Sequence, residues 1–416
     1  MWKDYTRTRI VFALYPDRRF YSAILNSYRD DADRDKGKTA MAKGCPRSAT
    51  FAASPLYSLL FLHLFVAPLL LAFPIPCPDR SSTQLASTST MRSIAGLREI
   101  VDDYDVLLLD MWGVLHDGER PYTGVLEAVQ KLRSHDVKKK LIVLSNSSKP
   151  KEHSRRSLLK LGFDPDTSFD AIITSGEVCK DLLSSSPTEK SNAWWSNLQA
   201  SSVGSHKKAV VLGSGEDDLA YCQSCGWSVA TSVEEASLIL ARGTMTIECW
   251  GDDSTRVSCS ADPTGYATQL ESLLAVAAQR RLPMLVANPD KIRPDAARSP
   301  MPGAIGERYR ELLGGDDDTS LIERIGKPFP QVYTRALEPY QDNTVRVLMV
   351  GDALETDVVG GAATGIDTLW VLSDGVFAGD ARSPQDIVDD FNQHKDVTYA
   401  RGLTVTPTMW MPHFRW

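Results

Sequence analysis

Five short runs of aliphatic residues constrain the fold of this chain more than any other feature. They lie at residues 106–109, 141–144, 171–173, 345–350 and 368–372. Nearly continuous hydrophobicity over so few residues is typical of strands that are buried on both faces of a parallel sheet. Segments with helical spacing lie between the runs, at residues 124–134 and 152–160. This alternation predicts an α/β fold with a doubly wound, Rossmann-like parallel sheet.

A second α/β module interrupts this core between about residues 178 and 287. Its predicted strands lie at residues 209–212 and 238–240. Its predicted helix, residues 264–279, has one apolar face formed by Tyr266, Leu270, Leu273, Leu274, Ala277 and Ala278. We interpret the polar stretch of residues 184–208 as a loop or insertion on this module. The sequence "PMLVANPD" that follows the module is interpreted as the return to the core.

The first ninety residues differ from the rest of the chain. An apolar stretch at residues 56–73 follows Lys43 and Arg47 and precedes a segment rich in serine and threonine. Basic, then apolar, then small polar residues is the order of a targeting segment, and this two-part order resembles that of plastid leaders in algae with complex plastids. We therefore predict that residues 1–90 are absent from the mature protein and that it resides in an organelle, specifically a plastid.

Two alternatives for the first ninety residues stay open. The apolar stretch is near the minimum length that crosses a hydrocarbon core of about 30 Å, which allows a membrane anchor. His63 and Pro68 make it a poor spanning helix, so we expect no stable membrane association of the mature protein. A start at Met91 would remove the segment and give a cytoplasmic protein.

Composition argues against some partners and sites. The 416 residues include 46 lysines and arginines against 53 aspartates and glutamates, so the chain lacks the basic field that attracts nucleic acid. Its seven cysteines are an odd, scattered number, which favours a reducing compartment over a disulfide framework. Cys222 and Cys225 form a lone C-x-x-C without a second pair, so two small apolar residues explain it better than a metal or redox site.

Polar residues stand directly after several predicted strands. They are Asp110 after the first run, Ser145 and Asn146 after the second, Asp352 and Asp357 after the fourth, and Lys327 in a "GKP" sequence before a predicted helix. Open α/β sheets bind ligands at the carboxyl ends of their strands. These residues therefore predict one shared site at that edge of the sheet.

Carboxylates, a hydroxyl and a lysine are the groups that Mg²⁺-assisted phosphoryl transfer requires. A carboxylate can attack phosphorus to form an aspartyl-phosphate when a divalent ion and a cation neutralise the phosphate. Asp110 and Asp352 suit Mg²⁺, which binds few carboxylates together with water and phosphate oxygens. Ser145 and the amide of Asn146 are candidates to hold phosphate oxygens, and Lys327 to bridge the nucleophile and the phosphate. Each residue alone is better explained as a helix cap, a plain loop or a turn, so the prediction depends on their order.

That order resembles the haloacid dehalogenase superfamily of phosphotransferases. "LLLDMWGVLHDG" is similar to its first motif, "LIVLSNSS" to its second, "IGKP" to its third and "VLMVGDALETDVVGG" to its fourth. "ITSGEV" and "VANPD" resemble the flanks of the α/β cap that the class IIA branch carries between the second and third motifs. This branch includes the NagD-type and nitrophenyl-phosphatase-like enzymes. The resemblance covers about residues 100–375.

The resemblance implies a Mg²⁺-dependent phosphatase that acts on a small phosphorylated metabolite, with Asp110 as the nucleophile and Lys327 beside it. Ser145 and Asn146 would bind the phosphate. The implied ligands of Mg²⁺ are Asp110, the backbone carbonyl of Trp112 and Asp352, with Asp357 in or just beyond the coordination sphere.

In these terms the chain divides into core residues 91–177 and 288–396, a C2-type cap of residues 178–287 and an aromatic tail of residues 397–416. The tail is expected to pack on the core or at a dimer interface, and a homodimer formed through the cap or the tail is compatible with the sequence. Arg242, in "LARGT" at a predicted strand end of the cap, has two interpretations of equal weight: a contact to a substrate anion and a structural role.

Trp112 departs from the family pattern. In the usual D-x-D motif the second aspartate is the general acid and base, whereas an indole has no group that transfers protons. General acid–base catalysis contributes about 10² to 10⁴ in rate, so we expect slow turnover or restriction to good leaving groups. "WGVLHDG" resembles one subgroup of class IIA with this substitution.

Two consequences of Trp112 stay open at this stage. His116, Asp117 and Glu119 lie nearby as substitutes for the missing acid, although a turn or solvent-facing position is favoured for each. The alternative function is a phosphate- or metabolite-binding protein that keeps the site but has weak or no turnover.

Overall fold

The computed structural model describes residues 91–416 apart from residues 136–137, 186–191, 203–206, 216, 250–256, 294–298, 316–319 and 343. The predicted targeting segment, residues 1–90, lies outside the described residues. Within the described part, no helix combines the length and apolar character that a membrane span requires. The described strands form two sheets of seven strands each.

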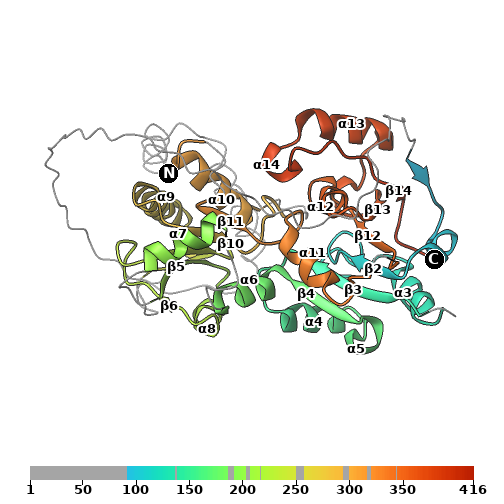
Figure 1. Ribbon diagram of the computed structural model, residues 1–416, viewed down its shortest axis with the longest axis horizontal. Coiled ribbons are helices and arrows are strands. Elements are labelled where there is room, and N and C mark those ends of the chain that lie inside the picture. Colours follow the sequence, from blue (N-terminus) through green and yellow to red (C-terminus); the bar gives the residue numbers. More distant parts are fainter. Residues whose placement is uncertain are drawn as a thin grey trace, which may run out of the picture. The chain divides into compact units, whose positions relative to one another are not determined.

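The core sheet has seven strands in the order β1-β14-β13-β12-β2-β3-β4 (Figure 1), and every neighbouring pair is parallel. The strands are β1 (Arg92–Ser93), β2 (Val106–Leu109), β3 (Lys140–Ser145), β4 (Ala171–Thr174), β12 (Val347–Gly351), β13 (Asp367–Val371) and β14 (Met409–Met411). The five aliphatic runs are therefore β2, β3, β4, β12 and β13, and the predicted doubly wound α/β fold is confirmed.

Helices cover both faces of this sheet because successive strand residues point to opposite sides. Leu107 and Leu109 of β2 pack in one apolar cluster with α3 and α4, and Val106 and Leu108 pack in another with α6 and α11. The helices of the core are α3 (Val125–Arg133), α4 (Lys151–Lys160), α5 (Pro165–Ser168), α6 (Ser175–Ser184), α11 (Pro330–Leu337), α12 (Val359–Thr364), α13 (Pro384–His394) and α14 (Val397–Ala400). Burial on both sides explains why the strands read as continuous aliphatic runs.

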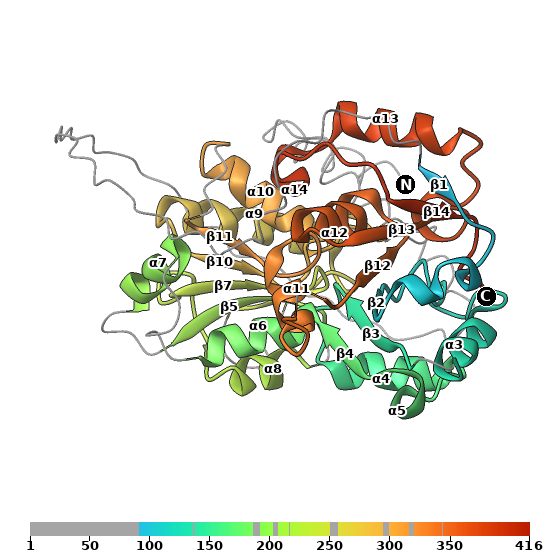
Figure 2. The same cartoon turned by 45° about the vertical axis from the view of Figure 1, so that its right-hand side comes forward.

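The second sheet has the order β11-β10-β7-β5-β8-β9, and β6 pairs with β5. Its strands are β5 (Lys208–Gly213), β6 (Ser228–Val229), β7 (Leu238–Ala241), β8 (Thr246–Glu248), β9 (Val257–Ser258), β10 (Met284–Val286) and β11 (Ile322–Arg324). Helices α9 (Pro263–Gln279) and α10 (Pro302–Leu312) lie on one face, and α8 (Asp218–Ser224) lies on the other (Figure 2). We call this sheet and its helices the cap.

The return to the core comes later in the chain than predicted. Strand β10, which belongs to the "PMLVANPD" sequence, pairs with β7 and β11 of the second sheet. Helix α10 then connects β10 to β11 as a parallel crossover. The second sheet therefore extends to Arg324, beyond the predicted limit at residue 287, because an aliphatic run alone does not reveal which of two sheets it joins.

One further segment differs from the prediction, and the tail agrees with one of its two expected placements. The expected loop of residues 184–208 contains helix α7 (Ala193–Ser202), whose buried residues Trp194, Trp195 and Leu198 join the apolar cluster on one cap face. This apolar spacing of one and four residues is helical, but it is surrounded by polar residues. The aromatic tail contributes β14, which lies between β1 and β13, so the tail packs as part of the core sheet.

Candidate active site

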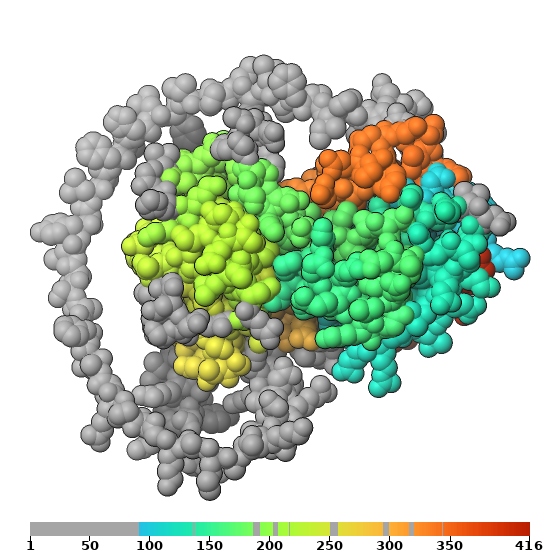
Figure 3. Space-filling view, turned by 90° about the horizontal axis from the view of Figure 1, so that it is seen from below, coloured from blue at the N-terminus to red at the C-terminus, as the bar shows by residue number. Residues whose placement is uncertain are grey.

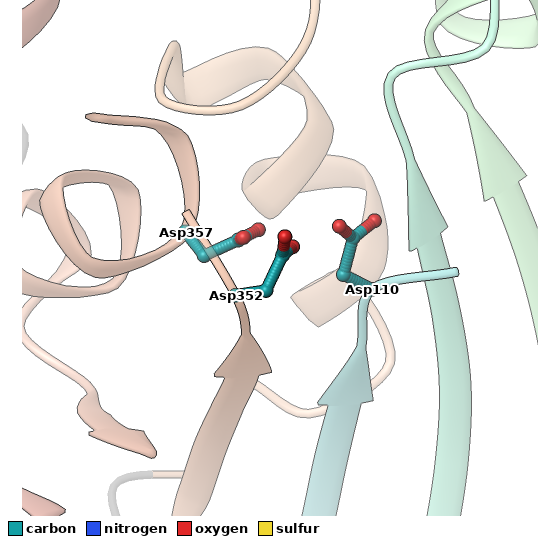
Figure 4. A group of neighbouring side chains, drawn as sticks. All are labelled: Asp110, Asp352 and Asp357. Atoms are coloured by element: carbon teal, nitrogen blue, oxygen red, sulfur yellow. The ribbon is translucent and has the colours of Figure 1, made fainter. Parts of the chain in front are cut away.

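Three carboxylates meet at the carboxyl edge of the core sheet. Asp110 directly follows β2 and Asp352 directly follows β12, and these two strands are neighbours in the sheet. Asp357 lies in the single π-helical turn Leu354–Val358 that begins two residues later. One oxygen of each carboxylate lies within 4.8 Å of the other two, and Figure 4 shows the three side chains converging above the strand ends. Strand order therefore brings together residues that are more than 240 positions apart.

Lys327 reaches this cluster from the loop between β11 and α11. Its Nζ lies 2.6 Å from Oδ1 of Asp110 and 2.7 Å from Oδ1 of Asp357. The lysine side chain is buried. It therefore makes direct ion pairs with two of the three carboxylates.

The charges of this cluster are not balanced. Burial raises the pKa of Asp110 even though Lys327 opposes this effect. Burial and the neighbouring charges of Asp110 and Asp357 raise the pKa of Asp352 far above its usual range. Burial also raises the pKa of Asp357 to about 6, again against Lys327. Three closely spaced carboxylates, two of them buried and two of them paired with one ammonium group, are the environment expected of a divalent cation site.

Two glycines allow the backbone to approach Asp352 closely. A Cβ on Gly113 would lie 2.2 Å from Cγ of Asp352, and a Cβ on Gly375 would lie 1.9 Å from its Oδ2. Both glycines have positive φ angles, which L side chains rarely adopt. The next amide after Gly375, that of Val376, donates to Oδ2 of Asp352 at 2.7 Å. This carboxylate is therefore held in one orientation, close to the loop that carries Trp112.

Ser145 and Asn146 lie at the end of β3, and the side chain of Asn146 joins this edge to the Lys327 loop. Its Oδ1 accepts from the backbone N–H of Lys327 at 2.7 Å, and its Nδ2 donates to the carbonyl of Lys327 at 3.1 Å. Nδ2 also donates to Oδ1 of Asp290 at 2.8 Å. The side chain of Asn146 thus positions the lysine. Ser145 Oγ accepts from the N–H of Ser147 at 3.2 Å.

Asp290 is a residue of this site that the sequence interpretation missed. Burial raises its pKa to about 6, and its charge in turn contributes to the raised pKa of Asp110. The signal was present, because Asp290 follows β10 by four residues and belongs to the "VANPD" sequence. It was interpreted only as the flank of the cap.

Comparison with known proteins agrees with this geometry. A model described as haloacid dehalogenase-like hydrolase matches residues 107–228, and a second model of that kind of hydrolase matches residues 324–394. The two matches include Asp110, Ser145, Lys327, Asp352 and Asp357. Over these two regions the chain is similar to haloacid dehalogenase-like hydrolases.

Individual relatives extend over most of this chain. D-glycerol 3-phosphate phosphatase of Mycobacterium tuberculosis is 24% identical over 320 residues, covering 75% of this chain and 76% of the relative. Phosphoglycolate phosphatase 2 of Arabidopsis thaliana is 25% identical over 291 residues, covering 70% of this chain and 88% of the relative. A solved haloacid dehalogenase-like hydrolase from Brucella suis is 25% identical, with a TM-score of 0.52, covering 77% of this chain and 99% of that one. Over most of its length the chain is therefore similar to proteins that are named phosphatases.

Trp112 lies within the first of the four motifs, two residues after Asp110. Its ring lies 6.0 Å from that of His116, measured between centroids, and the guanidinium carbon of Arg293 lies 5.8 Å from the centre of the indole. A Cβ on Gly118 would lie 2.8 Å from the indole. The tryptophan side chain is therefore packed among the residues of its own loop and Arg293, and it provides no group for proton transfer.

The structure favours the non-catalytic interpretations of two candidates for the missing acid. His116 is buried, its Nδ1 accepts from the N–H of Gly118 at 2.8 Å, and burial lowers its pKa to about 4. Asp117 is an exposed turn former whose Oδ1 accepts from the N–H groups of Glu119 and Arg120. Near neutral pH, a histidine with this lowered pKa and a carboxylate whose pKa is lowered by these two amides are both in the deprotonated form, so neither is poised to protonate a leaving group. Glu119 is exposed on the same turn.

Arg242 does not face the carboxylate cluster. Its side chain is buried in the cap, and its Nη1 lies 2.6 Å from Oδ1 of Asp218 and 3.1 Å from Oδ1 of Asp217. Of the two interpretations offered by the sequence, the structural one fits these contacts.

Proposed function

We propose that the protein is a Mg²⁺-dependent phosphomonoester hydrolase that acts on a small phosphorylated metabolite through an aspartyl-phosphate on Asp110. One observation carries the proposal: the Asp110 carboxylate lies 2.6 Å from a buried lysine and within 4.8 Å of two further buried carboxylates. A lone strand-end aspartate is explained as a cap, but a cluster with excess negative charge requires a cation. The metal and phosphate roles assigned to individual residues are part of this proposal.

Mg²⁺ fits the donors that this edge provides. Asp110, Asp352 and the backbone carbonyl of Trp112 would hold it, with Asp357 at or just beyond the coordination sphere, and waters and phosphate oxygens would complete the hard oxygen set that Mg²⁺ prefers. When bound, the ion would neutralise phosphate charge and polarise the ester. Gly113 and Gly375 leave room for the loop backbone beside Asp352.

The residues of the chain then perform the displacement in two steps. An oxygen of the Asp110 carboxylate attacks phosphorus, and the ester P–O bond breaks with its electron pair on the leaving oxygen, which takes a proton from solvent. Water next attacks phosphorus, and the bond between phosphorus and Asp110 breaks, which releases inorganic phosphate and restores the carboxylate. Lys327 holds Asp110 in place and stabilises charge on the phosphate, while Ser145 and the N–H of Asn146 would bind its other oxygens.

Trp112 determines which substrates are turned over well. A leaving oxygen with a low pKa departs without a proton, whereas an alkoxide needs one. With an indole where the family places its acid, we propose faster hydrolysis of acidic leaving groups than of alkyl phosphates. The same observation favours a second candidate function, a phosphate-binding protein with weak or no turnover.

The direct test compares small phosphate esters with and without metal. Nitrophenyl phosphate, glycerol 3-phosphate and phosphoglycolate are assayed with Mg²⁺, after EDTA and with Asp110→Asn. We expect EDTA to abolish activity and Asp110→Asn to lower it by at least about 10⁴-fold, while the turn residue variant Asp117→Asn serves as the matched control. Full activity in Asp110→Asn would overturn the proposal. Calorimetric binding of phosphate without product from any ester would select the second candidate.

The compartment is a separate proposal. The order of basic, apolar and Ser/Thr-rich residues before Met91 supports import into an organelle, a plastid in our interpretation, followed by removal of the segment. N-terminal sequencing of the native protein should find a new terminus near residue 91. An intact stretch of residues 56–73 in a membrane fraction would instead indicate an anchor, and translation that begins at Met91 without a longer precursor would indicate a cytoplasmic protein.

A further inference from the structure

The turn that follows the proposed phosphate-binding residues makes hydrogen bonds to the cap as well as to the core. The turn, Ser147–Lys149, comes directly after Ser145 and Asn146. From the core, the N–H of Gly176 donates to the carbonyl of Ser147 at 3.0 Å. From the cap, the carbonyl of Arg242 accepts from Oγ of Ser148 at 2.5 Å. The turn therefore lies between the two parts of the protein.

A group of charged side chains surrounds the cap side of this turn. The buried guanidinium of Arg242 is paired with Asp218 and Asp217. Oδ1 of Asp217 also lies 2.8 Å from Nζ of Lys149, the last residue of the turn. Asp217 thus bridges a cap arginine and a core lysine. Figure 3 shows the yellow-green surface of the cap adjoining the green surface of the core.

Tyr221 provides a third connection on the same side. The guanidinium carbon of Arg242 lies 4.0 Å from the centre of its ring, and its hydroxyl donates to the carbonyl of Gly176. Gly176 is packed so closely against the turn that a Cβ there would lie 2.3 Å from the carbonyl oxygen of Ser148. The cap therefore contacts the turn directly through Arg242 and Asp217, and indirectly through Gly176.

We propose that Arg242 and Asp217 are positioning residues through which the cap holds the Ser145–Lys149 segment in its phosphate-binding conformation. The inference rests on the proposed function, because it takes Ser145 and Asn146 as phosphate ligands. The described polar contacts of both cap residues are with the turn and with Asp218, and not with the carboxylate cluster. Their effect is to fix the conformation of a loop whose N–H and hydroxyl groups must be aimed in advance.

The test measures binding of inorganic phosphate by calorimetry, with Mg²⁺ present, in full-length protein. Asp217→Asn and Lys149→Met both break the bridge and leave the buried pair of Arg242 and Asp218 in place, so folding is retained. We expect phosphate to bind about 5-fold more weakly or worse in each, with an unchanged apparent affinity for Mg²⁺. Lys149→Arg keeps the ion pair and should restore phosphate binding.

The Asp217→Asn variant separates positioning from simple electrostatics. Removal of a negative charge near an anion site strengthens anion binding by Coulomb attraction alone, so weaker binding must come from the loop. The matched control is Glu235→Gln, because Glu235 pairs with Lys208 at 2.7 Å elsewhere in the cap. Phosphate affinity in Asp217→Asn equal to or stronger than that of the control would overturn the inference while leaving the proposed function intact. Absence of phosphate binding in the wild type would overturn both.

Discussion

The carboxyl edges of the two sheets carry similar groups but differ in charge balance. At the core edge, Asp110, Asp352 and Asp357 share the single ammonium of Lys327. At the cap edge, Asp217 and Asp218 are paired with the guanidinium of Arg242, and Lys149 adds a second cation. These differences appear in the pKa values. Burial raises the pKa of all three core carboxylates, whereas Lys149 and Arg242 overcome burial and lower the pKa of Asp217 to about 2.

This difference in charge balance distinguishes a ligand-binding site, at the core edge, from a structural ion-pair cluster, at the cap edge. A balanced cluster is complete without a ligand, and loss of one member exposes an unpaired buried charge. A cluster with excess carboxylates is incomplete and gains stability from a cation. The three experiments below test this comparison.

The largest effect is expected when the cation of each edge is removed. Lys327→Met should lower phosphatase activity by about 10² to 10³-fold, as expected for loss of one group that stabilises transition-state charge. Arg242→Met leaves buried Asp218 without its guanidinium and should cost about 3 to 5 kcal/mol of stability. Because excess carboxylates bind metal, Mg²⁺ should raise the melting temperature of Lys327→Met. The rise in melting temperature that Mg²⁺ gives Arg242→Met should be no larger than the rise that it gives the wild type. A larger increment for Arg242→Met would contradict the comparison.

A smaller effect is expected from pH, with opposite signs at the two edges. Burial raises the pKa of Asp290 to about 6 in the folded state, from 3.8, so the folded protein holds a proton that the unfolded chain releases. The contribution of the Asp290 carboxyl to the free energy of unfolding is greatest below about pH 4 and is lost as the pH rises through 6. The loss by pH 7 is at most roughly 3 kcal/mol, at about 1.4 kcal/mol for each pKa unit.

Asp290→Asn removes this loss and can still accept from Nδ2 of Asn146. In EDTA, urea unfolding should therefore find the variant more stable relative to wild type at pH 7 than at pH 4. Asp217 behaves in the opposite way, because its lowered pKa stabilises the folded state above pH 3.8 and this contribution is lost as the pH falls toward 2. Asp217→Asn should thus lose stability at pH 7 and approach wild type near pH 2. Parallel pH curves for the two variants would be inconsistent with the charge assignments.

The sequence predicted the core edge better than the cap edge for a physical reason. Asp110 and Asp352 follow aliphatic runs that can only be buried parallel strands, and the carboxyl ends of such strands must meet. Lys327 and Asp290 instead arrive on loops of the cap sheet. The sequence placed Lys327 at the site through its motif and missed Asp290, and Arg242 was equally compatible with a substrate contact. Their partners are determined by how two sheets pack, which no local pattern encodes.

The same limit explains the elements that were missed. Helix α7 is held by Trp194, Trp195 and Leu198 against the cap sheet, although its surrounding residues are polar. Strand β14 is only three residues long and becomes a strand because β13 and β1 flank it. Both depend on long-range packing more than on local propensity.

The smallest effect, and the most informative about catalysis, is expected from Trp112→Asp. This substitution places a fourth carboxylate beside an edge that already has excess negative charge, where burial and like charges favour a protonated acid. A protonated carboxyl near the leaving oxygen assists alkoxide departure but contributes little to nitrophenolate, which leaves without a proton. We therefore expect the ratio of kcat/KM for glycerol 3-phosphate to that for nitrophenyl phosphate to rise about 10-fold, below the 10² to 10⁴ of an optimally placed acid.

Trp112→Asn, which removes the same ring contacts to His116 and Gly118 without adding an acid, is the matched control, and circular dichroism establishes that both variants fold. If the ratio of kcat/KM values is the same in the two variants, the loop of Trp112 does not face the leaving group. The excess negative charge at the core edge would then serve metal binding alone.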